Sequence, residues 1–364
     1  MTQIKCYGCG AVIQTNDPDK IGYTPESALA KEHVLCQRCF QMKNYHKLTK
    51  TQMTRNDYFA ILEEISSKDN LYVYLIDLFD FNGSLISGLN RHLNSDNILI
   101  VGNKRDVLPK SIKDQKIEHW LRRQLNGDGV KYLDVILSSG KTNYHLDELI
   151  DKINHYRNGR NVYVVGVTNV GKSSLINALL KHYANVDSHL ITTSEFPGTT
   201  LGTIEIELDE KSSLYDTPGI VNEHQMANRL AIEDLGLIVP KGELRPMNFQ
   251  INSDQTLYFG GLARVDYFQG EKTPFICYFP RQIKIHRTKT VNAKRVYHND
   301  ATLLPKIPGI EDVDQMQSYV FNLDGTKQDI VISGLGFFTV TQKNGKIKVM
   351  VPKGIGVFVR EALI

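Results

Sequence analysis

One segment of the 364-residue chain has the residue types that hold phosphate groups. It runs Gly166-Val-Thr-Asn-Val-Gly-Lys-Ser-Ser174, between a β-branched run at 161–166 and an apolar helical run at 175–180. In a strand–loop–helix of this pattern, backbone N–H groups cradle phosphates at the helix N-terminus. The lysine reaches the β- and γ-phosphates, and the first serine ligates Mg²⁺. We therefore predict phosphate binding by Gly166, Thr168, Asn169, Val170, Gly171, Lys172, Ser173 and Ser174, with Ser173 on Mg²⁺.

A second motif, Asp216-Thr217-Pro218-Gly219, ends a short strand-like run and has the form DxxG. Its aspartate is expected to hold Mg²⁺ through water, and the Gly219 N–H to sense the γ-phosphate. The polar run Phe196–Thr200 lies between the two motifs, and one of its threonines should complete the Mg²⁺ shell. We prefer Thr200, with Thr199 beside it as the alternative.

A third motif, Asn103-Lys104-Arg105-Asp106, follows a buried-strand pattern at 97–102 and identifies the base. The Asp106 carboxylate can accept from both N1–H and the exocyclic amine of guanine, whereas adenine offers neither donor in that arrangement. Because an unpaired buried carboxylate is costly, such a site rejects the wrong base by ~10⁴-fold. Asn103 is expected to steady the loop, and the Lys104 stem to lie along the purine ring.

A fourth motif, Ser138-Ser139-Gly140-Lys141, stands at the end of another strand-like run, where its backbone can contact the guanine carbonyl. An NKxD motif alone is weak evidence for a nucleotide. Together with SSGK, the phosphate loop and DTPG, each at a strand end, it predicts GTP and GDP as the ligands.

The order of these motifs is unusual. In Ras-like GTPases the phosphate loop comes first, whereas here NKxD and SSGK precede it and DTPG comes last. A circularly permuted G domain explains this order, with strands at 71–79, 97–103, 130–138, 161–166 and near 216, and a crossover helix at 145–157. The segment after Gly219 then leads into the C-terminal region, so ordering of this segment by the γ-phosphate would act on that region.

Hydrolysis is expected to be slow, because Ile220 stands where Ras-type enzymes carry the glutamine that orients water. Asn169 offers a substitute, since the loop resembles phosphate loops in which this asparagine helps bind K⁺ beside the β- and γ-phosphates. The alternative is that Asn169 only stabilises the loop. The residues assigned to hydrolysis are Lys172, Asn169, Thr200 and Gly219.

Four of the five cysteines form two CxxC pairs, Cys6 with Cys9 and Cys36 with Cys39. Two such pairs can complete a tetrahedral Cys₄ zinc site, which leaves no position open for catalysis. We therefore predict structural Zn²⁺, ahead of disulfides or a redox CxxC. The fifth, Cys277, lies in the apolar run 275–279 and is expected to be buried.

The composition, with 41% hydrophobic and 23% charged residues, is that of a globular protein and excludes wholesale disorder, collagen and coiled coil. We find no membrane-spanning run and no signal segment, so we expect a cytoplasmic protein with no membrane partner. The net charge of +3 divides into about +3 for residues 1–50, about −6 for the middle and about +6 for 240–364. This asymmetry points to a polyanion at the two ends, unless the imbalances are only solvated faces.

The C-terminal region reads as strands at 255–260, 264–268, 275–279, 283–287, 329–332, 337–341, 346–351 and 356–360, and Lys343-Asn-Gly-Lys346 predicts a hairpin. Between Glu271 and Asp300 there are basic side chains and no acidic ones. The candidate RNA contacts in this stretch are Arg281, Lys284, His286, Arg287, Lys289, Lys294 and Arg295. Alternation predicts Lys284, His286 and Thr288 on one strand face, with Tyr278 and Tyr297 near enough to stack on bases. The alternative is an edge strand guarded by lysines.

With these motifs the chain resembles the YqeH family of circularly permuted GTPases. The resemblance rests on the two CxxC pairs, Asp77-Leu-Phe-Asp-Phe-Asn-Gly-Ser84, NKRD, GVTNVGKSS, EFPGTT and DTPGI, and spans most of the chain. It implies an α/β fold in which a circularly permuted P-loop (Ras-like) GTPase domain is flanked by an N-terminal Cys₄ zinc-finger module and a C-terminal β-rich domain. That last domain would be similar to an RNA-binding attenuation protein.

The resemblance also implies a link to biogenesis of the bacterial small ribosomal subunit. Related plant and mitochondrial proteins were once labelled nitric-oxide-associated. Because no haem or flavin site is recognisable in the sequence, we do not predict nitric-oxide synthesis.

We expect three domains: a zinc module at 1–50, the G domain at 51–222, and a helical linker with the β-rich domain at 223–364. The leading hypothesis is a monomeric GTP switch on the 30S subunit or its precursor, with rRNA contacted by the two flanking domains. The alternative is an RNA- or protein-binding scaffold in which GTP is a structural or regulatory ligand. A GTPase regulating tRNA modification or DNA replication has no support beyond the shared G motifs.

Overall fold

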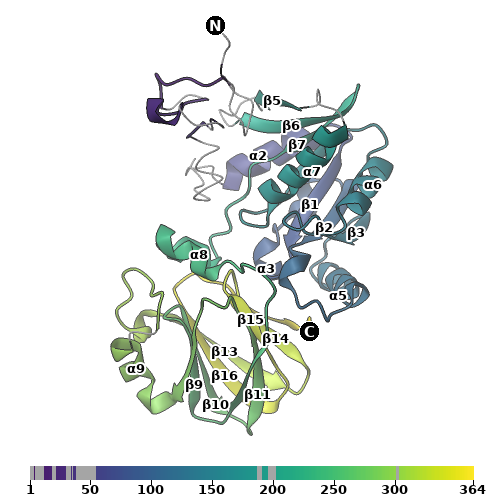
Figure 1. The fold of residues 1–364 in the computed structure, drawn as a ribbon. Helices are drawn as coiled ribbons and strands as arrows, with labels where there is room; N and C mark the ends of the chain where they lie inside the picture. The colour runs from purple at the N-terminus through teal and green to yellow at the C-terminus, as the bar shows by residue number, and fades with distance from the viewer. Residues whose placement is uncertain are drawn as a thin grey trace.

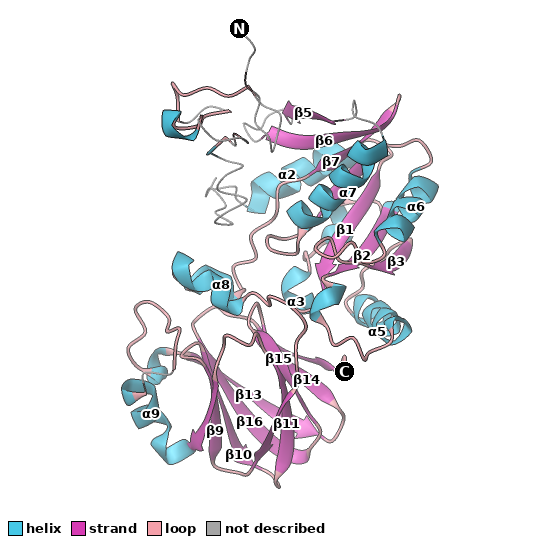
Figure 2. Ribbon diagram, viewed as in Figure 1, coloured by secondary structure: helices cyan, strands magenta, loops and turns pink. Residues whose placement is uncertain are grey.

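The structure, a computed structural model, describes residues 4, 12–18, 22–29, 34, 36–37, 55–186, 191–195, 202–300 and 303–364. Most of them form two units, an α/β unit and a β-rich unit, joined by the segment that follows strand β7 (Figure 1). Most helices belong to the α/β unit, whereas the second unit is mainly strands (Figure 2). Within the described ranges, no helix is both long enough and apolar enough to cross a membrane.

The α/β unit is built on a seven-stranded sheet with the spatial order β3-β2-β1-β4-β7-β6-β5. The neighbours from β3 to β7 run parallel, and β6 and β5 are added antiparallel. The strands are Leu71–Asp77 (β1), Ile98–Asn103 (β2), Asp134–Leu137 (β3), Val162–Val165 (β4), Ile191–Glu195 (β5), Gly202–Asp209 (β6) and Ser212–Asp216 (β7).

Every residue of β1 and β2 is buried, because helices cover a parallel sheet on both faces. The helices of this unit are Arg55–Ser66 (α2), Phe81–Ser84 (α3), Leu89–His92 (α4), Asp114–Gly127 (α5), Leu146–Arg157 (α6) and Lys172–Val186 (α7). Since the carboxyl ends of parallel strands meet at one edge, the loops after β1, β2, β3, β4 and β7 converge there.

The β-rich unit has two five-stranded sheets with the orders β12-β9-β10-β16-β13 and β17-β14-β15-β11-β8. Its core includes aromatic rings from both sheets, such as Phe259 and Phe338, whose centroids lie 6.2 Å apart. Its elements are Met247–Ile251 (β8), Gln255–Phe259 (β9), Ala263–Gln269 (β10), Thr273–Tyr278 (β11), Ile285–Lys289 (β12), Ala293–Asn299 (α9), Gln317–Asp324 (β13), Gln328–Ile332 (β14), Gly336–Val340 (β15), Lys343–Val351 (β16) and Val357–Glu361 (β17).

The expected strands correspond to elements of the structure, but β5 in the α/β unit and β8, β13 and α9 in the β-rich unit were not foreseen. The predicted hairpin at Lys343–Lys346 is wrong. β15 and β16 belong to different sheets, and the segment lies within β16, where the pairing register with β13 shifts at Asp324. Asn344 has a φ of 59° there, so the Asn-Gly step forms a bulge and not a two-residue turn.

The two units share an apolar contact and a C-terminal anchor. Phe79 and Val107 of the α/β unit pack with Leu244, Tyr278 and Phe337. Near the C-terminus, β17 returns to α5, where the Trp120 indole N–H donates a 2.9 Å hydrogen bond to the carbonyl of Glu361. The buried Arg360 guanidinium lies 4.9 Å from the Trp120 ring and 5.0 Å from the Phe337 ring. A cation between two rings contributes about 0.5–2 kcal/mol for each contact.

We expect Trp120→Ala to lower the free energy of unfolding by ~3–5 kcal/mol, because a large buried ring is lost together with its contact to Arg360. Glu361→Gln is the control, since the Arg123–Glu361 pair is about half exposed and such pairs contribute less than ~1 kcal/mol. Urea unfolding followed by circular dichroism measures both. A loss in Trp120→Ala no larger than in the control would contradict this role of the ring.

Candidate nucleotide-binding site

The loop between β4 and α7 has the backbone shape of a phosphate cradle. Asn169 and Gly171 have φ angles of 67° and 94°, which turn the chain before α7 begins at Lys172. A β-carbon on Gly171 would lie 2.5 Å from the Asn103 amide nitrogen, so this position requires glycine. Ser173 and Ser174 follow in the first turn of α7 with exposed side chains. The strand before the loop and the helix after it are as the sequence predicted.

Lys172 lies over this loop, and its ammonium donates a 2.9 Å hydrogen bond to the carbonyl of Gly166. The side chain is 8% exposed. Burial lowers the pKa of Lys172 to about 8, although the Asp216 carboxylate nearby acts in the opposite direction. Bound phosphates would supply negative charge and restore the ordinary, protonated state of the lysine.

Asn103 ties the base-reading loop to the phosphate loop. Its amide donates a 2.8 Å hydrogen bond to the carbonyl of Val170, and its side-chain oxygen accepts from the Gly140 N–H at 3.3 Å. Three of the four motifs therefore meet at one buried amide. The steadying role expected of Asn103 from the sequence corresponds to these contacts.

Lys104 is held between the phosphate loop and the end of β1. Its φ of 64° is left-handed, and its ammonium donates 2.6 Å hydrogen bonds to the Asp77 carboxylate and to the carbonyl of Asn169. Two anchors on one ammonium fix the course of the aliphatic stem, which is the part expected to lie along the purine.

Asp106 receives a hydrogen bond from the Ser139 hydroxyl at 2.6 Å, which joins the NKRD and SSGK motifs directly. The Ser138 hydroxyl is buried and donates to the carbonyl of Tyr144 at 2.9 Å, which closes the loop on itself. A β-carbon on Gly140 would lie 2.5 Å from the backbone of Leu175, so the SSGK loop packs against the start of α7. The Asp106 carboxylate, predicted from the sequence to bind guanine, is thus oriented by its neighbours.

The DTPG motif lies beside the phosphate loop. Thr217 donates from both its backbone N–H and its hydroxyl to the carbonyl of Val164, and the Thr168 N–H donates to the carbonyl of Ile220 at 2.7 Å. A β-carbon on Gly219 would lie 2.7 Å from the Lys172 nitrogen. Gly219, preceded by Pro218, therefore lies next to the cation expected to hold the γ-phosphate. Asp216 ends β7 just before them.

Several predicted site residues lie outside the described part of the chain. They are Thr199, Thr200, Cys6, Cys9 and Cys39. Cys36 is described and is 2% exposed. No group of three metal-ligating side chains occurs among the described residues, which leave out three of the four CxxC cysteines. Cys277 is fully buried as predicted, and burial raises the pKa of its thiol.

Asp77 is a residue of the site that was not predicted from the sequence. The register pairs Asp77 with Asn103, so the last residue of β1 is beside the first residue of NKRD. An acidic residue at the end of an otherwise apolar strand was the signal that could have identified it. A second missed contact joins Lys141 of the SSGK motif to the carbonyl of Lys241, at 2.8 Å, in the segment between the units.

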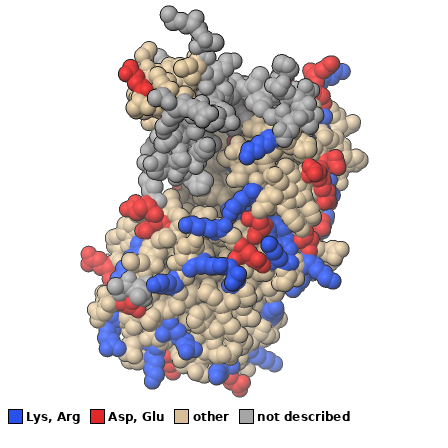
Figure 3. All heavy atoms as spheres, viewed as in Figure 1, with Lys and Arg blue, Asp and Glu red and all other residues tan. Residues whose placement is uncertain are grey.

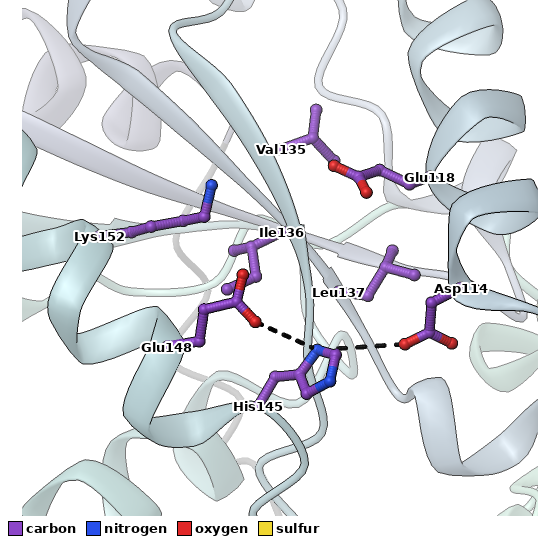
Figure 4. A pocket seen from close by; sticks show the side chains of 8 residues that line it. All are labelled: Asp114, Glu118, Val135, Ile136, Leu137, His145, Glu148 and Lys152. Carbon is purple, nitrogen blue, oxygen red and sulfur yellow. Dashed lines mark ion pairs between the residues drawn. The ribbon is translucent and has the colours of Figure 1, made fainter.

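A small polar pocket lies between α5, β3 and α6 (Figure 4). His145 lies between Asp114 and Glu148, at 4.0 Å and 3.6 Å. The volume of about 70 Å³ is far below the ~300 Å³ of small ligand pockets, so this is not the nucleotide site.

The strand face predicted for His286 and Thr288 is present in the structure, but it is not open to a ligand as expected. His286 and Thr288 share a face of β12, and His286 pairs in register with Tyr258, which packs with Ala293 and Tyr297 of α9. The His286 ring lies 3.2 Å from the Asp300 carboxylate. Tyr278 and Tyr297 are 4% and 1% exposed, so neither can stack on a base. Alternation therefore predicted the face of β12 correctly, with Ile285 packed against the core, but α9 was not foreseen over it.

The other candidates remain at the surface. Arg281, Lys284, Arg287, Lys289, Lys294 and Arg295 are exposed. Lys294 is paired with Asp312 and Asp314 at 2.8 and 2.9 Å. In Figure 3, basic side chains are more frequent than acidic ones over the visible face of the β-rich unit.

Comparison with known proteins gives two family matches. Residues 161–255 match a family described as 50S ribosome-binding GTPase, and residues 272–363 match one described as YqeH-like, C-terminal. The first match contains the phosphate loop and the DTPG motif, and the second contains most of the β-rich unit.

Individual proteins are also similar to this chain over nearly all of its length. The "Uncharacterized protein YqeH" of Bacillus subtilis is 49% identical over 367 residues, covering all of both chains. The "Putative nitric oxide synthase" of Oryza sativa is 30% identical and covers 98% of this chain and 77% of its own. The "NO-associated protein 1, chloroplastic/mitochondrial" of Arabidopsis thaliana is 29% identical, with 98% and 76% covered.

We expect Asp106→Asn to weaken GDP binding by at least ~10²-fold, because two charge-assisted hydrogen bonds to guanine contribute about 1.5–3 kcal/mol each. Asp128→Asn, at the exposed end of α5, is the control and should bind as the parent does. Isothermal titration calorimetry measures both affinities. Equal affinities in the two variants would remove Asp106 from base recognition.

We expect GTP binding to take up protons above pH 8. In the free site the pKa of Lys172 is about 8, so part of the lysine is neutral there and must be protonated when phosphates bind. Affinity should therefore fall as the pH rises through 8. Calorimetry at pH 8.5 in buffers of different ionisation enthalpy measures the uptake, and Lys172→Met should abolish it. Identical enthalpies in all buffers would contradict the lowered pKa.

Proposed function

The chain belongs to the YqeH family of GTP-binding proteins, and on this premise we propose that it is a slowly hydrolysing GTP switch in assembly of the 30S ribosomal subunit. One observation carries the nucleotide part of the proposal. The Asn103 side chain holds the NKRD, SSGK and phosphate loops together at one point, with Asp106 and Lys104 oriented beside it. Such a constellation fits a guanine nucleotide and its phosphates.

We further propose that the G domain is circularly permuted. The strand that precedes the phosphate loop, β4, has β7 with its DTPG end on one side and β1 on the other, and β2 with its NKRD end follows β1. The motifs therefore converge although the chain visits NKRD first and DTPG last. As a consequence, the segment 220–246 leads from Gly219 to the β-rich unit and does not return to the sheet of the G domain.

For Mg²⁺, the donors that fit are the Ser173 hydroxyl in the first turn of α7 and the Asp216 carboxylate at the end of β7, with Thr200 or Thr199 as a third. Hydroxyl and carboxylate oxygens are the ligands that Mg²⁺ prefers. The ion would neutralise charge on the β- and γ-phosphates, while Lys172 and the Gly219 N–H contact the γ-phosphate.

Slow hydrolysis follows from Ile220, which is 7% exposed and carries no group that can orient water. Asn169 is exposed at the rim of the phosphate loop, where its side-chain oxygen could contribute to a K⁺ site, or the residue could serve only the left-handed turn. Equal turnover in K⁺ and Na⁺ would remove the K⁺ role.

We propose structural Zn²⁺ on Cys6, Cys9, Cys36 and Cys39. Four thiolates in two CxxC pairs are a donor set that suits zinc, and Cys36 is buried as a metal-bound thiolate would be. The expected content is one zinc per chain, measured by atomic emission. A Cys36→Ser variant that retained full zinc would exclude this ligand.

We propose rRNA as the polyanion that the basic flanks contact. Arg281, Arg287 and Lys289 are exposed, and the last two stand on β12, an edge strand of the β-rich unit. Arginine and lysine on an open edge can follow a phosphate backbone, although they also guard an edge against pairing. The description of the matched GTPase family names the 50S subunit, so both subunits belong in the test.

The second candidate function is a scaffold for RNA or protein in which GTP is a structural or regulatory ligand. The absence of a water-orienting side chain at Ile220 favours it. Lys172→Ala separates the two functions in a complementation assay: a scaffold that needs no cycling still complements when folded, whereas a switch does not.

We expect purified 30S particles to raise GTP turnover more than 50S particles do. The triple variant Arg281→Glu, Arg287→Glu, Lys289→Glu should lose this rise and keep its GDP affinity, because the substitutions lie on the β-rich unit. Removing three phosphate contacts should also reduce the slope of log affinity against log salt by about 2. Stimulation by 50S alone would overturn the assignment to the 30S subunit, and stimulation by neither particle would overturn a ribosomal role.

A further inference from the structure

The segment Asp77-Leu-Phe-Asp80-Phe-Asn-Gly83-Ser84 contacts both the nucleotide site and the β-rich unit. Its first aspartate accepts a 2.6 Å hydrogen bond from Lys104, and its second accepts hydrogen bonds from Gln225 and Ser333. Neither aspartate takes part in the proposed GTP chemistry. The segment starts at the last residue of β1 and ends with α3, between the two units in Figure 1.

We propose that this segment couples the two units: Asp77 positions the purine-contacting Lys104, and Asp80 with Gly83 binds the chain that follows DTPG to the β-rich unit. The inference rests on the proposed function as a GTP switch. It assigns roles to two positioning residues and identifies the contacts through which the β-rich unit can respond to the nucleotide.

The nucleotide end of the segment is fixed by its own hydrogen bonds. One carboxylate oxygen of Asp77 accepts from the Phe79 N–H at 2.9 Å, and the other accepts from Lys104 at 2.6 Å. Asp77 is buried, so the ion pair is little screened by water. The same ammonium donates to the carbonyl of Asn169, so that a shift of the phosphate loop would reach Asp77 through Lys104.

The other end of the segment holds the chain beyond DTPG. The Gln225 amide donates to the Asp80 carboxylate at 2.9 Å, and Asn222 donates to the carbonyl of Gly83 at 2.8 Å. The Ser333 hydroxyl of the β-rich unit donates to Asp80 at 3.2 Å, and the Met226 N–H donates to the carbonyl of Ser333 at 2.9 Å. Residues 222–226 therefore lie between the α/β unit and the turn after β14.

Ser84 joins the two ends, so that a displacement of one end would act on the other. Its hydroxyl donates to the carbonyl of Asp80 at 2.8 Å and accepts from the Asp77 N–H at 3.0 Å. The buried Tyr74 hydroxyl in turn donates to the carbonyl of Ser84 at 2.8 Å. A residue that binds both aspartates leaves the segment little freedom to deform between its two ends.

At the Asp80 end, the segment has no room for a larger residue and contains a buried carboxylate. A β-carbon on Gly83 would lie 2.0 Å from the Asp80 carboxylate and 2.5 Å from the Ser333 hydroxyl, so only glycine allows this close contact. Burial, and then the charge of Asp77, raise the pKa of Asp80 to about 6. The donors from Gln225 and Ser333 offset part of that cost, so removing them would leave a buried carboxylate poorly paired.

A double-mutant cycle on GDP affinity tests the Asp77 role in the full chain. Asp77→Asn should weaken GDP binding ~10-fold, and the double variant Asp77→Asn, Lys104→Met should bind no worse than Lys104→Met alone. The control is Asp69→Asn, at the far end of β1, where Asp69 pairs with Arg160 at the surface. Additive losses, or an Asp77→Asn affinity equal to that of the control, would overturn this role.

Hydrogen exchange read by mass spectrometry tests the coupling. In the parent chain, replacing GDP by a non-hydrolysable GTP analogue should change exchange in residues 222–226 and 330–336. Gln225→Leu and the milder Asn222→Ala should keep GDP affinity within ~3-fold and reduce that change at 330–336 by at least half. Asn322→Ala, on β13, is the matched control and should leave it unchanged.

The experiments distinguish a failure of the proposed GTP function from a failure of the proposed coupling. A parent chain that does not bind GDP would remove the proposed function itself. A parent chain that binds GDP but shows no nucleotide-dependent exchange at 330–336, or variants that retain the full change, would overturn the coupling and leave the nucleotide site intact.

Discussion

The hydrogen bond from the Asn103 side chain to the carbonyl of Val170 joins two loops that lie 67 residues apart in the chain. The rest of the nucleotide site depends on it. It holds the base-reading loop against the phosphate loop, and the other end of the same amide accepts from Gly140 of the SSGK motif. Such an arrangement is possible because parallel strands end at one edge of the sheet, whatever order the chain follows.

The polar contacts in the nucleotide site differ in strength from those at the junction of the two units. Contacts within the site are charged and sheltered: Lys104 with Asp77, Lys172 with the loop carbonyl and Ser139 with Asp106. Contacts at the outer junction, such as Arg123 with Glu361, are about half exposed and contribute little by themselves. The junction relies instead on apolar burial and on the Arg360 guanidinium between the Trp120 and Phe337 rings.

The segment after DTPG connects these two regions. It leaves the phosphate loop at Ile220, whose carbonyl accepts from Thr168, and by Gln225 and Met226 it is bonded to both Asp80 and Ser333. A change of a few tenths of an ångström at Gly219 would thus act on groups that are already hydrogen-bonded to the β-rich unit. Packed interfaces respond to such shifts by changing state and not by gradual deformation.

The sequence by itself determined the ligand chemistry, because the phosphate loop, DTPG, NKRD and SSGK are local patterns whose function depends on residue type and spacing. It also predicted β1, β2 and β4, since short apolar runs rich in β-branched residues favour buried strands. Tertiary structure alone decided the partner of Asp77 and the bulge at Asn344. It also decided that α9 packs on Tyr258, the register partner of His286, and so covers that face of β12. These outcomes depend on contacts between residues far apart in the chain, and a local pattern contains no information on what will pack against it.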